Sequence, residues 1–275
     1  MTQRVYNPAA RRLAIQRQLL LDGSVTVETL ARDLDVSVAT IRRDLTQLED
    51  DGLIRRTHGG AVTQAKRGAD QAFGIREQID SEAKSRIARA ACQLVEADQT
   101  ILMNDGSTVL ALARELAARD LPLTVVTPGV NIATCLSENP RISAYLLGGR
   151  VRHQTLGTSG SFAERMLAEI NADIAFLAAE GTTVAEGMTY SYETDSQLAR
   201  LMHERSTTTV VLATTRKLEQ RDRISALQVS AIDMLVTECE DPDMLESFRR
   251  CGVAIVPAAA PSPESADLAW AMGSQ

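Results

Sequence analysis

The sequence predicts a small N-terminal helical domain followed by a larger α/β domain with a mostly parallel sheet. Apolar residues recur at helical spacing through the first 62 residues, whereas beyond residue 81 short apolar runs alternate with helical segments. The length of 275 residues is sufficient for two domains, each with its own core. We therefore expect domains at 8–63 and 81–257, a linker at 64–80 and a flexible tail at 258–275.

Three helices are expected in the first domain, at 8–21, 27–34 and 38–50. A tight turn separates the second helix from the third, and Ser37 is a good N-cap for the third. In that third helix, steps of three and four residues place one apolar set inward: Val38, Ile41, Leu45 and Leu48. Beyond Gly52, segments 53–57 and 61–62 are expected to pair as a small hairpin around His58-Gly59-Gly60.

Two short helices joined by a turn form the geometry that enters a DNA major groove. The outward face of the third helix carries Thr40, which can meet a thymine methyl group or a phosphate, and Arg42 and Arg43, which can bond guanine edges or backbone oxygens. Basic residues on the hairpin suit phosphates or the flanking minor groove. An arginine pair on an exposed helix can also be merely solvated, but its place in this order of elements favours DNA. The predicted DNA-contacting residues are Ser37, Ala39, Thr40, Arg42, Arg43, Arg55, Arg56 and His58.

The charge distribution confines DNA binding to the first domain. Residues 1–67 hold 11 Lys and Arg and 8 Asp and Glu, a balance of +3, and the remaining 18 and 28 give −10, which sums to the net charge of −7. Because an acidic body repels DNA, only a basic face of the N-terminal domain can dock there.

Seven apolar strands are expected in the second domain, at 100–103, 123–127, 143–147, 174–178, 209–213, 234–237 and 253–256. Small polar loops follow five of them, and in open α/β sheets ligands bind where such loops leave the carboxyl ends of strands. Glycines and helix N-termini there favour an anion, and Lys217 can supply the full charge that phosphate prefers. Each loop alone is no more than a turn, but five on one edge predict a phosphate site.

Two motifs carry a family resemblance. The run Thr40-Ile-Arg-Arg-Asp-Leu45 and the later run His58-Gly-Gly-Ala61, at this separation, resemble the DeoR family of bacterial regulators, and the resemblance continues through the second domain. It implies a winged helix-turn-helix repressor whose effector domain is similar to sugar-phosphate isomerases and CoA transferases. It also implies that Asp105 and Glu180 contact ligand hydroxyls. The expected effector-binding residues are Asp105, Gly106, Ser107, Thr108, Thr127, Gly129, Gly149, Glu180 and Lys217.

Four positions depart from the pattern of that family. Pro128 stands where an asparagine is usual, Thr214 in place of an aspartate, Ala199 in place of a lysine and Asp195 in place of a glutamate. These changes suggest altered effector selectivity.

The leading hypothesis is a repressor of a carbohydrate catabolic operon, released from double-stranded operator DNA by a small phosphorylated sugar or a related metabolite. A homodimer or homotetramer is expected, because a single small helix-turn-helix motif gives little specificity for one DNA sequence. The alternative is a sugar-phosphate isomerase-like enzyme with an accessory DNA-binding domain, and the sign of regulation, repressor or activator, stays open. No enzyme activity, cofactor or metal site is expected, and neither is membrane insertion. Four scattered cysteines and the lack of a secretory signal predict a cytoplasmic protein.

Overall fold

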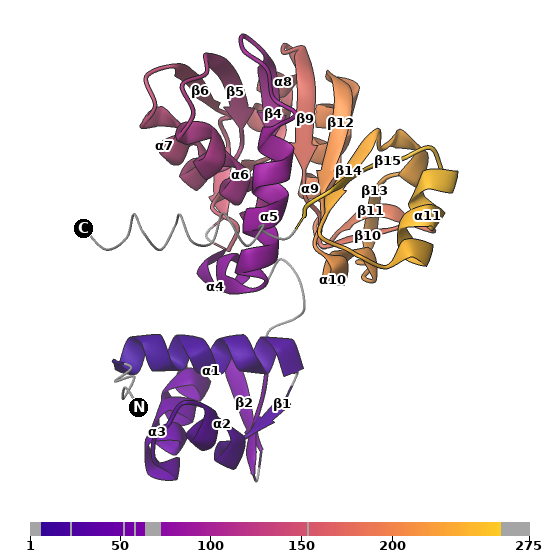
Figure 1. Ribbon diagram of the computed structural model, residues 1–275. Helices are drawn as coiled ribbons and strands as arrows, with labels where there is room; N and C mark the ends of the chain where they lie inside the picture. Colours follow the sequence, from indigo (N-terminus) through magenta and orange to yellow (C-terminus); the bar gives the residue numbers. More distant parts are fainter. Residues whose placement is uncertain are drawn as a thin grey trace, which may run out of the picture. The chain divides into compact units, whose positions relative to one another are not determined.

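The structure is a computed structural model that describes residues 7–22, 24–51, 53–57, 59–63, 73–152 and 154–259 (Figure 1). Its contacts divide the chain into two compact units, 1–79 and 80–275. Within the expected linker, helix α4 (Phe73–Gln78) buries Phe73 and Ile75. The expected flexible tail begins with Ala258, which is buried and donates its backbone N–H to the carbonyl of Thr237, and residues 260–275 lie outside the described part.

The first unit has the three predicted helices and the predicted hairpin. Its elements are α1 (Pro8–Asp22), β1 (Ser24–Thr26), α2 (Val27–Asp33), α3 (Val38–Asp50), β2 (Ile54–Thr57) and β3 (Gly60–Thr63). The core joins α1, α2 and α3 to the sheet through Ile15, Leu19, Leu30, Ile41, Leu45, Leu48 and Ile54. Val38 departs from its expected inward position: it is 36% exposed, because it begins the helix.

A third strand in this unit was not predicted. β1 pairs with β3, so the sheet order is β1-β3-β2 and the expected hairpin forms one side of a three-stranded wing. The pairing depends on Gly60, because a Cβ atom there would lie 2.1 Å from the carbonyl oxygen of Val25. Only glycine permits so close an approach of two backbones.

The second unit is built on a seven-stranded parallel sheet. The strand order is β15-β14-β12-β9-β4-β5-β6, and all six neighbouring pairs are parallel, which confirms the predicted fold class. The strands are β4 (Thr100–Met103), β5 (Leu123–Thr127), β6 (Ile142–Leu146), β9 (Ala172–Leu177), β12 (Ser206–Leu212), β14 (Met234–Thr237) and β15 (Ala254–Pro257). They occupy the seven predicted segments to within three residues at either end.

Helices cover both faces of this sheet. In Figure 1, α5 (Ser81–Cys92) and α6 (Ser107–Ala117) lie in front of the strands, whereas α8 (Ser161–Ala168) and α9 (Glu193–Glu204) lie behind them. The remaining helices are α7 (Val130–Ser137), α10 (Thr215–Leu218) and α11 (Pro242–Arg250), with a 3-10 turn at Val229–Ala231. Burial on both faces explains why the strands read as continuous apolar runs.

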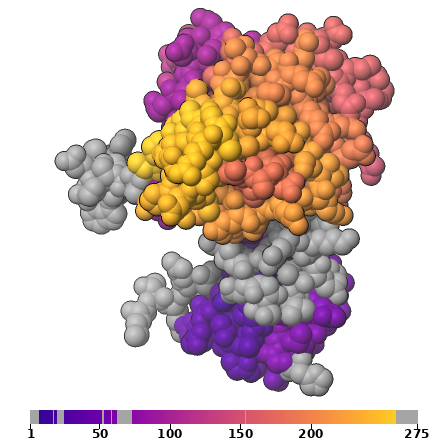
Figure 2. Space-filling model, turned by 90° about the vertical axis from the view of Figure 1, so that its right-hand side faces the viewer, coloured from indigo at the N-terminus to yellow at the C-terminus, as the bar shows by residue number. Residues whose placement is uncertain are grey.

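Two small antiparallel sheets were not predicted. One is the hairpin of β7 (Arg150–Arg152) and β8 (Gly157–Ser159), and the other joins β10 (Gly181–Thr183), β11 (Gly187–Tyr190) and β13 (Ile224–Leu227). On the face shown in Figure 2, the last described residues (yellow) lie beside the part of the second unit that precedes them in the sequence (orange). Strands of only three or four residues give too short a period-2 pattern to be recognised.

Candidate functional site

The N-terminus of α3 is capped by the predicted residue. The Ser37 hydroxyl accepts the backbone N–H of Thr40 at 3.2 Å and lies 2.9 Å from the Thr40 hydroxyl. Ser37 and Ala39 are exposed and Thr40 is half-buried. The first turn of α3 is thus fixed by side chains that also face solvent.

Replacing Ser37 by alanine is expected to lower the free energy of unfolding of the first unit by about 1 kcal/mol, because the cap of α3 is lost. Urea unfolding followed by circular dichroism measures the loss. Ser37→Asn is the matched control, because asparagine caps helices as well as serine does. An equal loss in both variants would show that capping is not the role of Ser37.

Arg42 and Arg43 lie on the exposed face of α3, opposite the buried Ile41 and Leu45. Within the described part of the chain, neither guanidinium group forms an ion pair. Both side chains are therefore available for an anionic surface.

Asp44, the next residue along α3, has a structural role in packing α3 against α1. It is buried, and its carboxylate accepts hydrogen bonds from the Arg11 guanidinium of α1 at 2.5 and 3.2 Å. The bond to Asp44 raises the pKa of Arg11 above its ordinary value, although burial opposes it. This pair fixes α1 against α3 and was not predicted.

On the wing, Arg55 and Arg56 are both exposed. The Arg56 side chain donates to the Thr46 hydroxyl at 3.1 Å, and its backbone N–H donates to Glu49 at 2.9 Å. Arg56 therefore joins the wing to α3, whereas Arg55 projects from the wing. His58 lies outside the described residues.

The five predicted ligand loops of the second unit lie at one edge of the sheet, since every strand they follow is parallel to its neighbours. Gly106 precedes α6 as its N-cap, Ser107 is half-buried, and Thr108 is buried in the first turn. The first turn of α6 therefore remains a candidate for anion binding.

The hairpin β7–β8 covers the start of α7. The Gly129 N–H donates to the Thr127 hydroxyl at 3.0 Å, and the Val130 N–H donates to the Leu156 carbonyl at 2.8 Å. The Thr158 N–H in turn donates to the Pro128 carbonyl at 2.9 Å. Donors that were expected to face phosphate therefore already have partners in this structure.

Gly149 lies at the exposed start of that hairpin. Its φ is +144°, and a Cβ atom there would lie 2.6 Å from the Ser159 carbonyl oxygen. Its position requires glycine for backbone reasons. The close approach of the Gly149 backbone to Ser159 allows the β7–β8 hairpin to form.

Arg152 on β7 is a site residue that sequence reasoning missed. Its guanidinium forms ion pairs with Asp195 and, at 3.6 Å, with Asp105, and lies 5.1 Å from the centre of the Tyr192 ring. Its side chain is 15% exposed, and its Nε and Nη1 atoms are buried without a hydrogen-bond partner among the described residues. The structure thus brings the predicted Asp105 together with Asp195, one of the four departures from the family pattern, around a cation that was not predicted.

The charges of this cluster shift the pKa of Arg152 and of the buried Tyr190. Burial lowers the pKa of Arg152, but the charges of Asp195 and Asp105, and more weakly Glu180, outweigh burial and raise it overall. Burial raises the pKa of Tyr190 well above its ordinary value, and the same carboxylates raise it further. Arg152 therefore stays charged, and the Tyr190 hydroxyl stays a donor to the Ala178 carbonyl at 3.0 Å.

Lys217 reaches the loop after β9. Its Nζ donates to the Glu180 carbonyl oxygen at 2.8 Å, so two predicted effector residues are in contact. Of the positions that depart from the family pattern, Asp195 pairs with Arg152, Thr214 is the buried N-cap of α10, and Ala199 is buried in α9.

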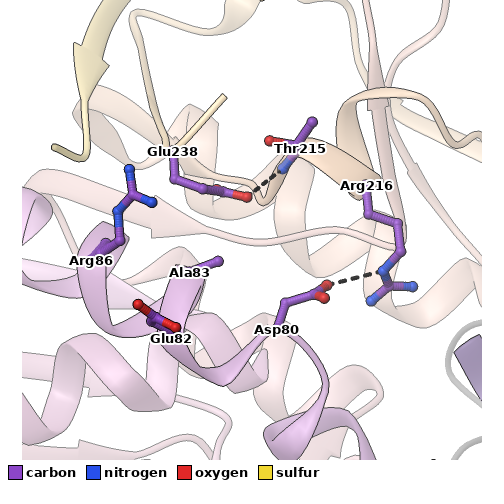
Figure 3. Close-up of a pocket in the computed structure, with 7 residues that line it drawn as sticks. All are labelled: Asp80, Glu82, Ala83, Arg86, Thr215, Arg216 and Glu238. Atoms are coloured by element: carbon purple, nitrogen blue, oxygen red, sulfur yellow. Dashed lines mark hydrogen bonds and ion pairs between the residues drawn. The ribbon is translucent and has the colours of Figure 1, made fainter. Parts of the chain in front are cut away.

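A cavity of about 460 Å³ lies beside α10 (Figure 3). It is lined by Asp80, Glu82, Ala83, Arg86, Thr215, Arg216 and Glu238, which include no predicted effector residue. Dashed lines in the figure mark the bonds from Thr215 N–H to Glu238 at 2.9 Å and from Arg216 to Asp80 at 3.0 Å. Thr215 and Arg216 of α10 line the cavity, and the next residue of α10 is the predicted effector residue Lys217.

The described residues show neither a metal-binding cluster nor a membrane-spanning helix. They contain no cluster of three or more His, Cys, Asp or Glu side chains that could hold a metal ion. None of their helices is both long and apolar enough to cross a bilayer.

Both units of the chain match models of known protein families. The model of the DeoR-like helix-turn-helix domain matches residues 11–67, and that of the DeoR C-terminal sensor domain matches residues 79–239. The transcriptional regulator GolR of Listeria innocua is 36% identical over 84% of this chain and 91% of its own. The lactose phosphotransferase system repressor of Lactococcus lactis is 30% identical over 88% of this chain and 96% of its own.

Among solved structures, ribose 5-phosphate isomerase A from Methanocaldococcus jannaschii is 19% identical, with a TM-score of 0.38 over 50% of this chain and 55% of that one. The family of this chain is shown by the two family models, which match residues 11–67 and 79–239. The curated relatives are named as regulators of transcription and not as enzymes. The chain belongs to the DeoR family, and it is a DNA-binding transcriptional regulator with a C-terminal sensor domain.

Proposed function

We propose that this regulator represses a carbohydrate catabolic operon and is released from its operator by a small phosphorylated sugar. The single observation that carries the sensing part is the cluster of Asp105, Asp195 and Arg152, with Lys217 on the neighbouring loop. Carboxylates accept hydrogen bonds from sugar hydroxyls, and an ammonium group and a helix N-terminus favour phosphate. The repressor named above acts on a lactose phosphotransferase system, which supports a sugar-related operon here.

Phosphate is expected at Lys217 and the first turn of α6. Lys217 and the α6 N-terminus offer positive charge, whereas α7 offers less, because the Gly129 and Val130 donors are already bonded. The sugar hydroxyls then face Asp105 and Glu180. This orientation separates the anionic group of the effector from the carboxylates.

A panel of pentose and hexose phosphates, each beside its unphosphorylated sugar, tests the proposal. We expect at least one phosphorylated compound to raise the melting temperature and weaken operator binding, while its parent sugar does neither. Product formation would instead favour an isomerase. Failure of every compound to bind would overturn the sensing proposal, and failure to bind the duplex upstream of the coding region would overturn the repressor proposal.

Lys217→Ala is expected to weaken binding of the active phosphorylated compound by roughly tenfold or more, because a charge-assisted bond to phosphate is lost. Operator affinity without the compound should be retained. Calorimetry and fluorescence anisotropy measure the two affinities. Arg223→Ala, an exposed cation of the same unit, is the matched control. Equal compound affinity in Lys217→Ala and wild type would exclude Lys217 from the site.

At least a homodimer is proposed, because two recognition helices about 34 Å apart are needed to read both half-sites of an operator. Large apolar side chains that are exposed on neighbouring elements β6, β7 and α8 support burial against a second copy: Tyr145, Leu146, Val151, Phe162 and Met166. Sedimentation equilibrium gives the number of chains. A monomer at operator-binding concentrations would overturn this part.

A further inference from the structure

The short helix α10 is held on three sides by three consecutive residues. Thr215 donates its N–H to Glu238 at 2.9 Å, Arg216 donates to the Asp80 carboxylate at 3.0 Å, and Lys217 donates to the Glu180 carbonyl at 2.8 Å. Leu218 completes the helix and is buried. These three contacts connect α10 to Glu238, Asp80 and Glu180.

Asp80 has an unusual conformation for its position. It is the N-cap of α5, but its φ of 54° and ψ of 35° place it in the left-handed region, and its side chain accepts no capping hydrogen bond. Aspartate is among the best N-caps when its backbone is extended, whereas the left-handed conformation, which aspartate adopts more readily than most residues, does not favour capping. Asp80 therefore forgoes the cap of α5 while its carboxylate pairs with Arg216.

A second acceptor for Arg216 lies in the same cavity. Glu238 uses Oε1 to accept the Thr215 N–H, whereas its Oε2 is buried and has no hydrogen-bond partner within the described ranges. Arg216, Asp80 and Glu238 all line the cavity of about 460 Å³ (Figure 3). The guanidinium is therefore paired with Asp80, and the same cavity holds a second carboxylate with an unpartnered oxygen, that of Glu238.

We propose that Arg216 and Asp80 form a two-position relay, through which effector binding at Lys217 sets the backbone conformation at the start of α5. This relay rests on the proposed role of Lys217 in binding phosphate. In the first position, seen here, Arg216 holds Asp80 away from the helix. In the second, the bond from Lys217 to phosphate pulls α10 from this place, and Arg216 turns to Glu238. Loss of the Lys217 side chain alone supplies no such pull and leaves the first position in place.

The released Asp80 carboxylate then caps α5, and its backbone returns to the extended region. Because Asp80 is the first residue of the second unit, the relay acts where the chain enters from the DNA-binding unit. We assign operator binding to the first position, because release by an effector requires the second position to bind operator less tightly. A regulator of this kind needs a two-state element that both sites bias, and this pair of acidic partners supplies one.

The test uses the full chain with Arg216→Gln, which removes the ion pair and leaves Lys217 unchanged. Without any phosphorylated compound, we expect operator affinity to fall roughly tenfold, within the usual range of allosteric coupling. Hydrogen exchange at the Glu82 and Ala83 amides should slow, because Asp80 now caps them. Millimolar inorganic phosphate should produce both changes in wild type and little further change in the variant.

Two further variants keep the result interpretable if Arg216→Gln perturbs folding. Asp80→Asn removes the same ion pair from the other side and should reproduce the effect, and the double variant should add nothing, since both substitutions break one interaction. Arg221→Gln is the matched control, because it removes an exposed pair with Glu186 in the same unit. It should leave operator affinity and α5 exchange unchanged.

The relay is overturned if Arg216→Gln and Asp80→Asn keep wild-type operator affinity and wild-type exchange at Glu82 and Ala83. This outcome is independent of effector binding, because it is measured without phosphate. If neither inorganic phosphate nor any sugar phosphate changes the operator affinity of the wild-type protein, the proposed sensing function is overturned instead. The two failures are therefore distinguishable.

Discussion

Replacing Arg152 by methionine will lower the free energy of unfolding of the second unit by about 3 kcal/mol, the expected cost of breaking a buried ion pair from one side. Methionine fills similar space but leaves Asp105 and Asp195, which are 16% and 11% exposed, without their cation. Uncompensated charge in a poorly solvated site is the physical cause of the loss. Urea unfolding followed by circular dichroism measures it.

Two controls separate charge from packing in this experiment. Arg150→Met removes an exposed arginine from the same strand and should change stability little. Adding Asp195→Asn to Arg152→Met should restore part of the loss, because one unpaired carboxylate is removed. If the double variant were no more stable than the single one, the electrostatic account of the cluster would be wrong.

The double substitution Arg42→Ala with Arg43→Ala will weaken operator binding by roughly 100-fold or more, because each base or phosphate contact of this kind contributes about 1–3 kcal/mol. Both side chains are exposed on α3 and their removal costs no core contact. Stability and sugar-phosphate binding should therefore be unchanged. Fluorescence anisotropy with the upstream duplex, repeated at several salt concentrations, gives the affinity and its salt dependence.

Arg32→Ala is the matched control for this prediction. Arg32 lies on α2 of the same unit, is 76% exposed at its side chain and pairs with Asp33. Its loss should weaken binding only modestly, through the general charge of the unit. Equal effects of the two changes would indicate that α3 does not read the operator, and that the unit binds DNA by charge alone.

The sequence predicted the regular parts of the fold well. The strand at 123–127 was predicted with its observed bounds, and the helices at 38–50 and 27–34 to within one residue, because apolar periodicity reports burial directly. β1 was missed, since three residues after a helix stop signal look like a turn. The hairpin β7–β8 was missed for the same reason.

The candidate sites were only partly predictable. Asp105, Glu180 and Lys217 could be proposed because each follows a strand. Arg152 could not, because its partners Asp105 and Asp195 are brought to it by tertiary structure. Contacts of this kind depend on sheet order, and no local pattern in the chain encodes them.

The order β15-β14-β12-β9-β4-β5-β6 also has a consequence during synthesis. The first strand of this sheet to be made, β4, lies in its interior, and the chain extends to one edge through β5 and β6 before β9 pairs with the other side of β4. Until the ribosome has released β9, one side of β4 has no strand to pair with in this sheet. The nascent protein therefore has a vulnerable interval in which half of the sheet is open to mispairing, and chaperone protection matters most there.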